Sequence, residues 1–161
     1  MKKRLYIIAL CALVLAGCGR PSKVEQYRAE KRATDSVRLE EQVRSLAYYE
    51  AQLERLMPIA DSLLTLFSYE KNDKYQDHGY YVTNSDLRIL VRDDGKELLV
   101  YKEGKRLTAE GVKDLKNERV TEALARAEEL QVTISDIKEL EKRIQRTSLE
   151  VQKYQKRLQK Q

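Results

Sequence analysis

The sequence predicts a mainly α-helical fold: a long antiparallel two-helix coiled-coil hairpin with a small antiparallel β meander of three to four strands inserted between the helices. Residues 80–107 are the only stretch with the composition of strands. Charged segments with helical periodicity and similar length lie on either side, at 24–78 and 108–161. Two helices joined by a compact connection are expected to pack against each other in opposite directions.

The central stretch contains a two-residue hairpin signal, Asp94-Gly95, which predicts a type I′ turn. Counting outward from it places Arg92 opposite Glu97, where an ion pair is expected, and Leu90 opposite Leu99. Opposed residues share a face of the sheet. One face then carries the apolar side chains Leu87, Ile89, Val91, Leu98 and Val100. The other carries Arg88, Leu90, Arg92, Glu97, Leu99 and Tyr101.

Turn signals at Asn84-Ser85 and Glu103-Gly104 predict further short strands at Tyr80–Thr83 and Lys105–Leu107, within a meander spanning 79–107. A lone hairpin is marginal in water, so additional strands are expected. The apolar face needs cover, and either the helix ends or another subunit could supply it.

The first helical segment, 24–78, begins after a capping box in which Ser22 precedes Glu25 by three residues. Apolar residues recur in it every seven positions, as a coiled-coil seam requires. They are Leu39, Leu46, Leu53, Ala60 and Phe67, with companions Tyr49, Leu56 and Leu63. Pro58 predicts a kink rather than an end, and upstream of Leu39 the repeat fails.

The second helical segment, 108–161, repeats the seven-residue pattern. Its seam residues are Leu130, Ile137, Ile144, Val151 and Leu158, supported by Ile134, Leu140 and Tyr154. Thr133 and Thr147 dilute the seam, and Glu139–Arg143 is an i,i+4 pair in the favourable order. Because a two-helix seam is thin, self-association into a homo-oligomer is plausible.

The N-terminus has the three parts of a secretory signal peptide. Lys2, Lys3 and Arg4 are followed by the apolar run 5–16 and then by the residues Leu15-Ala16-Gly17-Cys18. This sequence resembles the lipobox of bacterial lipoproteins, a resemblance confined to residues 1–18. The alternative is an ordinary cleaved signal peptide with an incidental cysteine.

The lipobox resemblance implies removal of residues 1–17, acylation of Cys18 and a lipidated tether at 18–23. A thiol is the nucleophile that such an attachment requires, and several acyl chains make membrane anchoring effectively permanent. Gly19 stands where an inner-membrane retention signal would place Asp, which favours the outer membrane. The chain is therefore expected in the cell envelope, anchored by covalent lipid on Cys18.

Processing also changes the charge balance. Loss of three positive side chains leaves 28 Lys and Arg against 26 Asp and Glu, a net charge of +2. These charges are interleaved, as on solvated helix faces, so no nucleic-acid partner is expected. Cys11 lies in the signal peptide and Cys18 in the lipobox, which leaves no thiol for a disulfide or a metal, and no cofactor is expected.

Candidate catalytic residues are few. His78 is the only histidine and is expected to close the first helix near the negative end of its dipole rather than to bind metal. Asp93 and Asp94 form an adjacent carboxylate pair that turn chemistry explains. No phosphate-binding glycine loop or nucleophile elbow is present, so the chain is expected not to be an enzyme.

Tyrosines gather in and beside the central stretch at positions 69, 75, 80, 81 and 101. Tyrosine suits protein interfaces and also suits strands, so contact and core roles both stay open. The candidate partner-binding residues are Tyr80, Tyr81, Leu87, Ile89, Val91, Leu98, Val100 and Tyr101.

Three functional hypotheses follow from these features. The first is a non-enzymatic coiled-coil spacer or scaffold that presents a β module to a protein partner in the envelope. The alternative is a periplasmic holdase-type chaperone, since helix–hairpin–helix architecture resembles prefoldin in outline, without a matching motif. A third hypothesis is a spacer whose lysines contact peptidoglycan.

Overall fold

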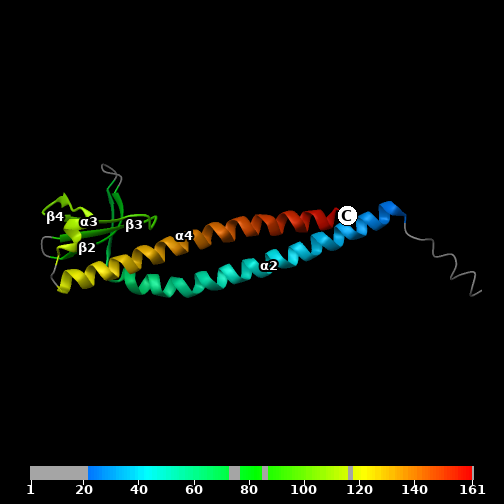
Figure 1. Cartoon of the computed structure of the whole chain (residues 1–161). Coiled ribbons are helices and arrows are strands. Elements are labelled where there is room, and N and C mark those ends of the chain that lie inside the picture. The colour runs from blue at the N-terminus through cyan, green and yellow to red at the C-terminus, as the bar shows by residue number, and fades with distance from the viewer. Residues whose placement is uncertain (1–21, 73–76, 85–86, 116–117, 161) are drawn as a thin grey trace, which may run out of the picture. The chain divides into compact units, whose positions relative to one another are not determined.

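The computed structural model describes residues 22–72, 77–84, 87–115 and 118–160, so Cys18 lies outside the described residues. Two long helices, α2 (Lys23–Leu64) and α4 (Glu118–Gln159), pack together with a five-stranded antiparallel sheet between them in sequence (Figure 1). The predicted fold class is confirmed. The chain divides into two compact units, one formed by residues 42–151 and the other by residues 1–41 with 152–161.

Helix α2 begins at the predicted capping box. The backbone N–H of Ser22 donates to Glu25 Oε2 at 2.7 Å, and the N–H of Glu25 donates to Ser22 Oγ at 3.2 Å. The helix continues through Pro58, as expected, but it ends at Leu64. The predicted extension to residue 78 is therefore wrong. Phe67, counted in the seven-residue repeat, lies beyond the helix and packs on the core from there.

The sheet contains β1 (Ser68–Asn72), β2 (Asp77–Asn84), β3 (Leu87–Arg92), β4 (Leu98–Lys102) and β5 (Lys105–Arg106) in sequential order. The register predicted for β3 and β4 is confirmed, with Leu90 opposite Leu99 and Arg88 opposite Tyr101. Arg92 and Glu97 form the expected ion pair at 3.3 Å. A fifth strand exists because β1 comes from residues assigned to the first helix.

The turn at Asp94-Gly95 is real but is not type I′, which needs positive φ at both central residues. Gly95 has φ +70°, whereas Asp94 does not have positive φ. The Gly95 N–H donates to Arg92 O at 2.9 Å, which closes a four-residue turn with glycine at its last position. Two consecutive positive φ values, 50° and 76°, occur instead at Glu103-Gly104, as type I′ requires. Of the predicted Asn84-Ser85 turn, residues 85–86 lie outside the described residues.

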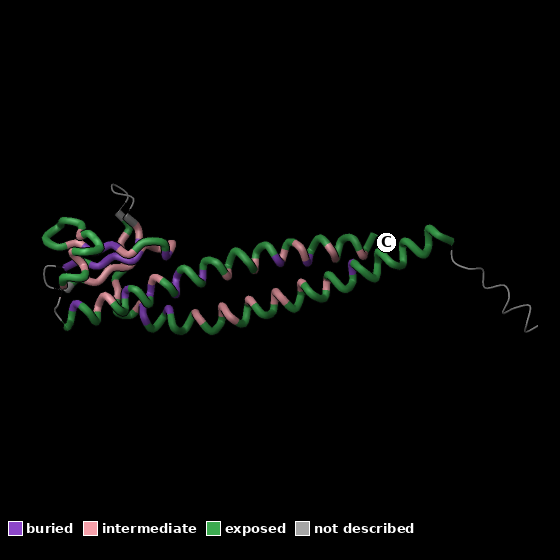
Figure 2. Tube along the Cα trace, in the orientation of Figure 1, coloured by how far each residue is buried: buried purple, intermediate pink, exposed green. Residues whose placement is uncertain are grey.

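The unit formed by residues 42–151 holds the hydrophobic core. The chain's own helices cover the apolar face of the sheet, which answers the question the sequence left open. Figure 2 shows buried positions in the central strands and at intervals along both long helices. The fully or largely buried core residues are Leu63, Leu87, Ile89, Val91, Val100, Val120, Ala127, Leu130 and Ile134.

The second helical segment is divided. Helix α3 (Ala109–Lys113) is capped by Thr108, whose Oγ1 accepts from the Gly111 N–H at 3.2 Å, and α4 begins afresh at Glu118. The predicted seam of α4 is buried at Leu130, Ile137 and Val151, along with Thr133 and Thr147. The two long helices also meet where the Arg143 guanidinium of α4 lies 5.9 Å from the centre of the Tyr49 ring of α2.

In the other unit, a buried carboxylate lies between the two long helices, that of Asp35 on α2. Asp35 is only 4% exposed, and its Oδ1 lies 3.8 Å from Arg157 Nη1 near the end of α4. It has the same heptad position as Leu63, Leu56 and Tyr49, fourteen residues before Tyr49, with the polar Gln42 between them. The ion pair of Asp35 with Arg157 thus lies in the part of α2 where the apolar repeat fails.

Candidate functional site: an edge strand and an adjoining cleft

The structure separates the candidate binding residues into two faces of the sheet. Leu87, Ile89, Val91 and Val100 are buried in the core beneath the helices, so their prediction as a partner-binding surface is wrong in this fold. Tyr80 and Leu98 are partly buried and pack against the same cluster. An alternating apolar face has the same sequence pattern whether helices or a partner cover it.

Tyr81 and Tyr101 lie on the opposite face and are half-buried. The Arg88 guanidinium stacks over the Tyr81 ring at 4.4 Å from its centre and forms an ion pair with Glu70 of β1. The cation is thus placed between an aromatic face and a carboxylate, which satisfies it in two ways. On this face Tyr81, Arg88 and Glu70 therefore contact one another, and the rings of Tyr81 and Tyr101 are only partly accessible.

His78 does not close a helix, contrary to the prediction. It lies in β2, opposite Lys71 of β1, and its carbonyl oxygen accepts from the Asp93 N–H at 3.2 Å. This backbone bond ties the start of β2 to the turn after β3. The prediction for His78 was wrong for the same reason as the predicted end of the first helix. The helix ends at Leu64 and residues 68–72 form a strand, so His78 is in the next strand.

Strand β1 is the feature that the sequence analysis missed. It is an edge of the sheet, with β2 as its only strand neighbour among the described residues. Ser68, Tyr69 and Lys71 are exposed. Tyr69 is 55% exposed, although the centre of its ring lies 5.2 Å from that of Tyr80. The polar, turn-forming residues 72–77 (Asn-Asp-Lys-Tyr-Gln-Asp) were a signal for the hairpin.

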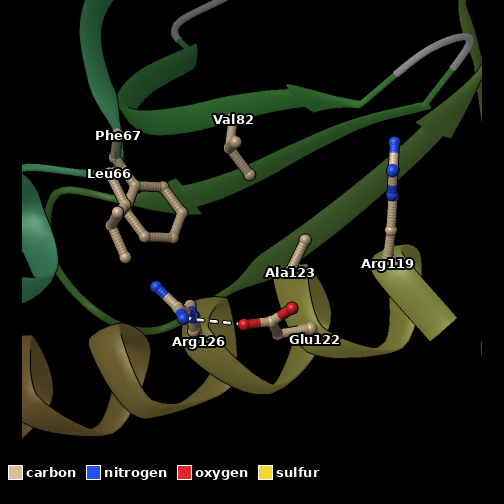
Figure 3. Close-up of a pocket in the computed structure, with 7 residues that line it drawn as sticks. All are labelled: Leu66, Phe67, Val82, Arg119, Glu122, Ala123 and Arg126. Atoms are coloured by element: carbon tan, nitrogen blue, oxygen red, sulfur yellow. Dashed lines mark hydrogen bonds and ion pairs between the residues drawn. The ribbon is translucent and has the colours of Figure 1, made fainter.

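A cleft adjoins the start of β1. Figure 3 shows Leu66 and Phe67, which immediately precede the strand, facing Val82 of β2 and Ala123 of α4. Its volume is about 260 Å³, below the usual range for small-molecule sites and suited to one or two side chains. Its remaining lining residues are the charged side chains Arg119, Glu122 and Arg126.

The charged residues come from one face of α4. Arg126 Nη2 donates to Glu122 Oε1 at 2.7 Å across one helical turn. Arg119 lies one turn before Glu122, so the three form a row along the cleft. The cleft could therefore hold an apolar side chain of a partner against Leu66, Phe67, Val82 and Ala123. A polar or acidic residue next to it in the partner would contact the row of charged side chains.

Among the described residues, no group of three or more His, Cys, Asp or Glu side chains is arranged to hold a metal ion. Within the same part of the chain, neither long helix is apolar enough over a bilayer's thickness to span one. Comparison with known proteins finds no family model, curated protein or solved structure that matches the chain.

Proposed function

We propose that the chain is a lipid-anchored, non-enzymatic envelope protein that presents its β sheet to a protein partner. The observation that carries this proposal is the exposed edge strand β1 beside a cleft that is lined by both apolar and charged side chains. Edge strands offer unpaired backbone groups and are used for strand addition by extended peptides. A partner segment adding to β1 could place one apolar side chain in the cleft.

The division of the chain supports a spacer role. Both chain ends belong to one compact unit, while the whole sheet belongs to the other. A lipid on Cys18 would thus be carried by the unit that holds no strand. Two long helices connect the units, so the anchor and the proposed docking strand are separated in the chain by α2.

The lipid anchor rests on the lipobox residues Leu15-Ala16-Gly17-Cys18. Treatment of cells with globomycin, or the substitution Cys18→Ser, is expected to leave the unprocessed precursor in the membrane. Metabolic labelling with an alkyne-bearing fatty acid measures acylation directly. Processing of the Cys18→Ser chain to a soluble mature form would refute lipidation.

The docking strand is tested by photo-crosslinking in cells. A photoreactive residue is placed at Tyr69 or Lys71 of β1 and, as a control, at Tyr48, which is 60% exposed on α2. We expect one dominant crosslinked protein from the β1 positions and none from the control. Equal capture from all three positions, or a crowd of unrelated proteins from β1, would overturn the docking proposal.

A second candidate function is a holdase-type chaperone. It is favoured by exposed apolar side chains on α2, where Tyr48 and Ile59 lie three turns apart on one side of the helix. Suppression of client aggregation by the purified chain at near-stoichiometric ratio would support it. A chain that leaves aggregation unchanged while retaining one crosslinked partner supports the scaffold instead.

A further inference from the structure

Charge is distributed unevenly between the two units. Residues 18–41 and 152–161 together contain ten Lys and Arg against five Asp and Glu, a net charge of +5. Residues 42–151 contain 18 against 21, a net charge of −3. These add to the +2 of the mature chain, so the small overall charge conceals a positive unit and a negative one.

The end of α4 is the most basic part of the positive unit. Residues 152–161 contain Lys153, Lys156, Arg157 and Lys160 and no acidic residue. Arg157 is paired with Asp35, and Lys153, Lys156 and Lys160 are all exposed. Of the five acidic residues in this unit, Asp35 is buried beside Arg157, and Glu25, Glu30, Glu40 and Glu41 are exposed on α2. The exposed surface at the end of α4 therefore carries positive charge.

Apolar side chains are exposed at the start of α2 in the same unit. Val24 is 59% exposed and Tyr27 is 65% exposed, and they lie one helical turn apart. Lys23 and Lys31 are exposed on the same part of the helix. Tyrosine with a neighbouring aliphatic residue and lysines is typical of segments that lie at the boundary between lipid headgroups and acyl chains.

We propose that this unit binds anionic phospholipid headgroups through Val24 and Tyr27 at the start of α2 and through Lys153, Lys156 and Lys160 at the end of α4. The inference deepens the proposed function, because a lipid on Cys18 would bring Val24, six residues later, to the membrane surface. Positive charge beside an anchored terminus complements an anionic leaflet and adds about fivefold to membrane affinity per basic side chain. The contact would hold this unit against the membrane, in addition to the covalent lipid.

The test uses the chain from residue 19 to residue 161, which lacks the acylated cysteine and keeps every described residue. Sedimentation with phosphatidylcholine vesicles, with and without phosphatidylglycerol, measures binding. We expect binding only to the anionic vesicles, reversed by high salt because the attraction is screened. The triple variant Lys153→Glu, Lys156→Glu and Lys160→Glu should lose at least about tenfold in affinity.

A matched control reverses three exposed lysines of the other unit, Lys105→Glu, Lys113→Glu and Lys142→Glu, and should bind as the unaltered chain does. Val24→Ser with Tyr27→Ser should weaken binding without changing its salt dependence. The proposal would be overturned by equal binding to neutral and anionic vesicles, or by an equal loss of vesicle affinity in both triple variants. Pelleting of the chain with isolated peptidoglycan but not with vesicles would also overturn it. Because the chain is unlipidated, failure of Cys18 acylation in cells would not alter these results.

Discussion

Gly95 lies against the backbone of α4 at Ser135, so the β3–β4 turn packs directly on the helix. A Cβ at Gly95 would be 2.6 Å from Ser135 N and 2.9 Å from its Cα. Gly95 also has φ +70°, which side chains of L-residues rarely adopt. Glycine is required here for two separate reasons, its backbone conformation and the space it leaves.

Gly95→Ala is therefore expected to destabilise the fold by about 2–5 kcal/mol, the sum of a left-handed backbone cost and an overpacking cost. Gly104→Ala is the matched control. Gly104 has φ +76°, but a Cβ there would meet no atom within 4 Å, so only the backbone cost of about 1–2 kcal/mol applies. Urea unfolding followed by circular dichroism measures both. Equal losses would show that contact with α4 contributes nothing.

The sheet register was predictable because strand geometry has a period of two, and Asp94-Gly95 fixes the starting point. Leu90 opposite Leu99 follows from counting alone. The end of the first helix was not predictable in the same way. Phe67 lies three residues past the end of the helix at Leu64 but still fits the seven-residue repeat. Because it is apolar and packs on the core, the repeat does not show that the helix has ended.

The candidate site was predicted less well because it depends on contacts between distant segments. Ile89 and Val91 were recognised as one apolar face, but only the packing of α4 shows that they are core. The cleft unites Phe67, Val82 and Ala123, which no local pattern connects. Asp35 is a similar case, since it pairs with Arg157 at the other end of the sequence.

The carboxylate of Asp94 gives a pH-dependent prediction. The Lys96 N–H donates to Asp94 Oδ1 at 3.0 Å and lowers the pKa of this carboxyl below its ordinary value, aided by the charges of Lys96 and Arg92. A carboxyl whose pKa is lower in the folded state stabilises the fold above its unfolded pKa of about 3.9, and this contribution disappears as pH falls through the folded value. Asp94→Asn should therefore lower the melting temperature at neutral pH, with a difference that vanishes in acid.

Asp93→Asn is the control for Asp94→Asn, because it removes the same charge from the adjacent turn position. Melting curves between neutral pH and pH about 2.5 compare the two variants with the unaltered chain. A difference for Asp94→Asn that persists undiminished in acid would show that the hydrogen bond to the charged carboxylate is not the cause.

Substitutions of two leucines of α4 can distinguish packing in the core from contact with a second copy of the chain. Leu130 is 0% exposed and Leu149 is 59% exposed. Leu130→Ala should cost about 2–5 kcal/mol of unfolding free energy through lost burial and a cavity. Leu149→Ala should change it by no more than about 0.5 kcal/mol, as expected for a surface position. A large loss at Leu149, measured by urea unfolding, would mean that a second copy covers this face in solution, and sedimentation velocity would then show an oligomer.

Tyr69 and Tyr80 distinguish contact from core within one ring pair. They are opposite each other on β1 and β2, yet Tyr69 is largely exposed and Tyr80 packs on the core. Tyr80→Ser should lower the unfolding free energy by about 1–3 kcal/mol, because it removes a partly buried ring. Tyr69→Ser should cost less than about 1 kcal/mol, since only the ring–ring contact is lost. If β1 is the docking strand, Tyr69→Ser should nevertheless weaken capture of the partner crosslinked from Lys71, whereas circular dichroism stays unchanged. If the Tyr69→Ser chain still captures the partner fully and only the destabilised Tyr80→Ser chain loses it, the Tyr69 side chain does not contribute to partner binding.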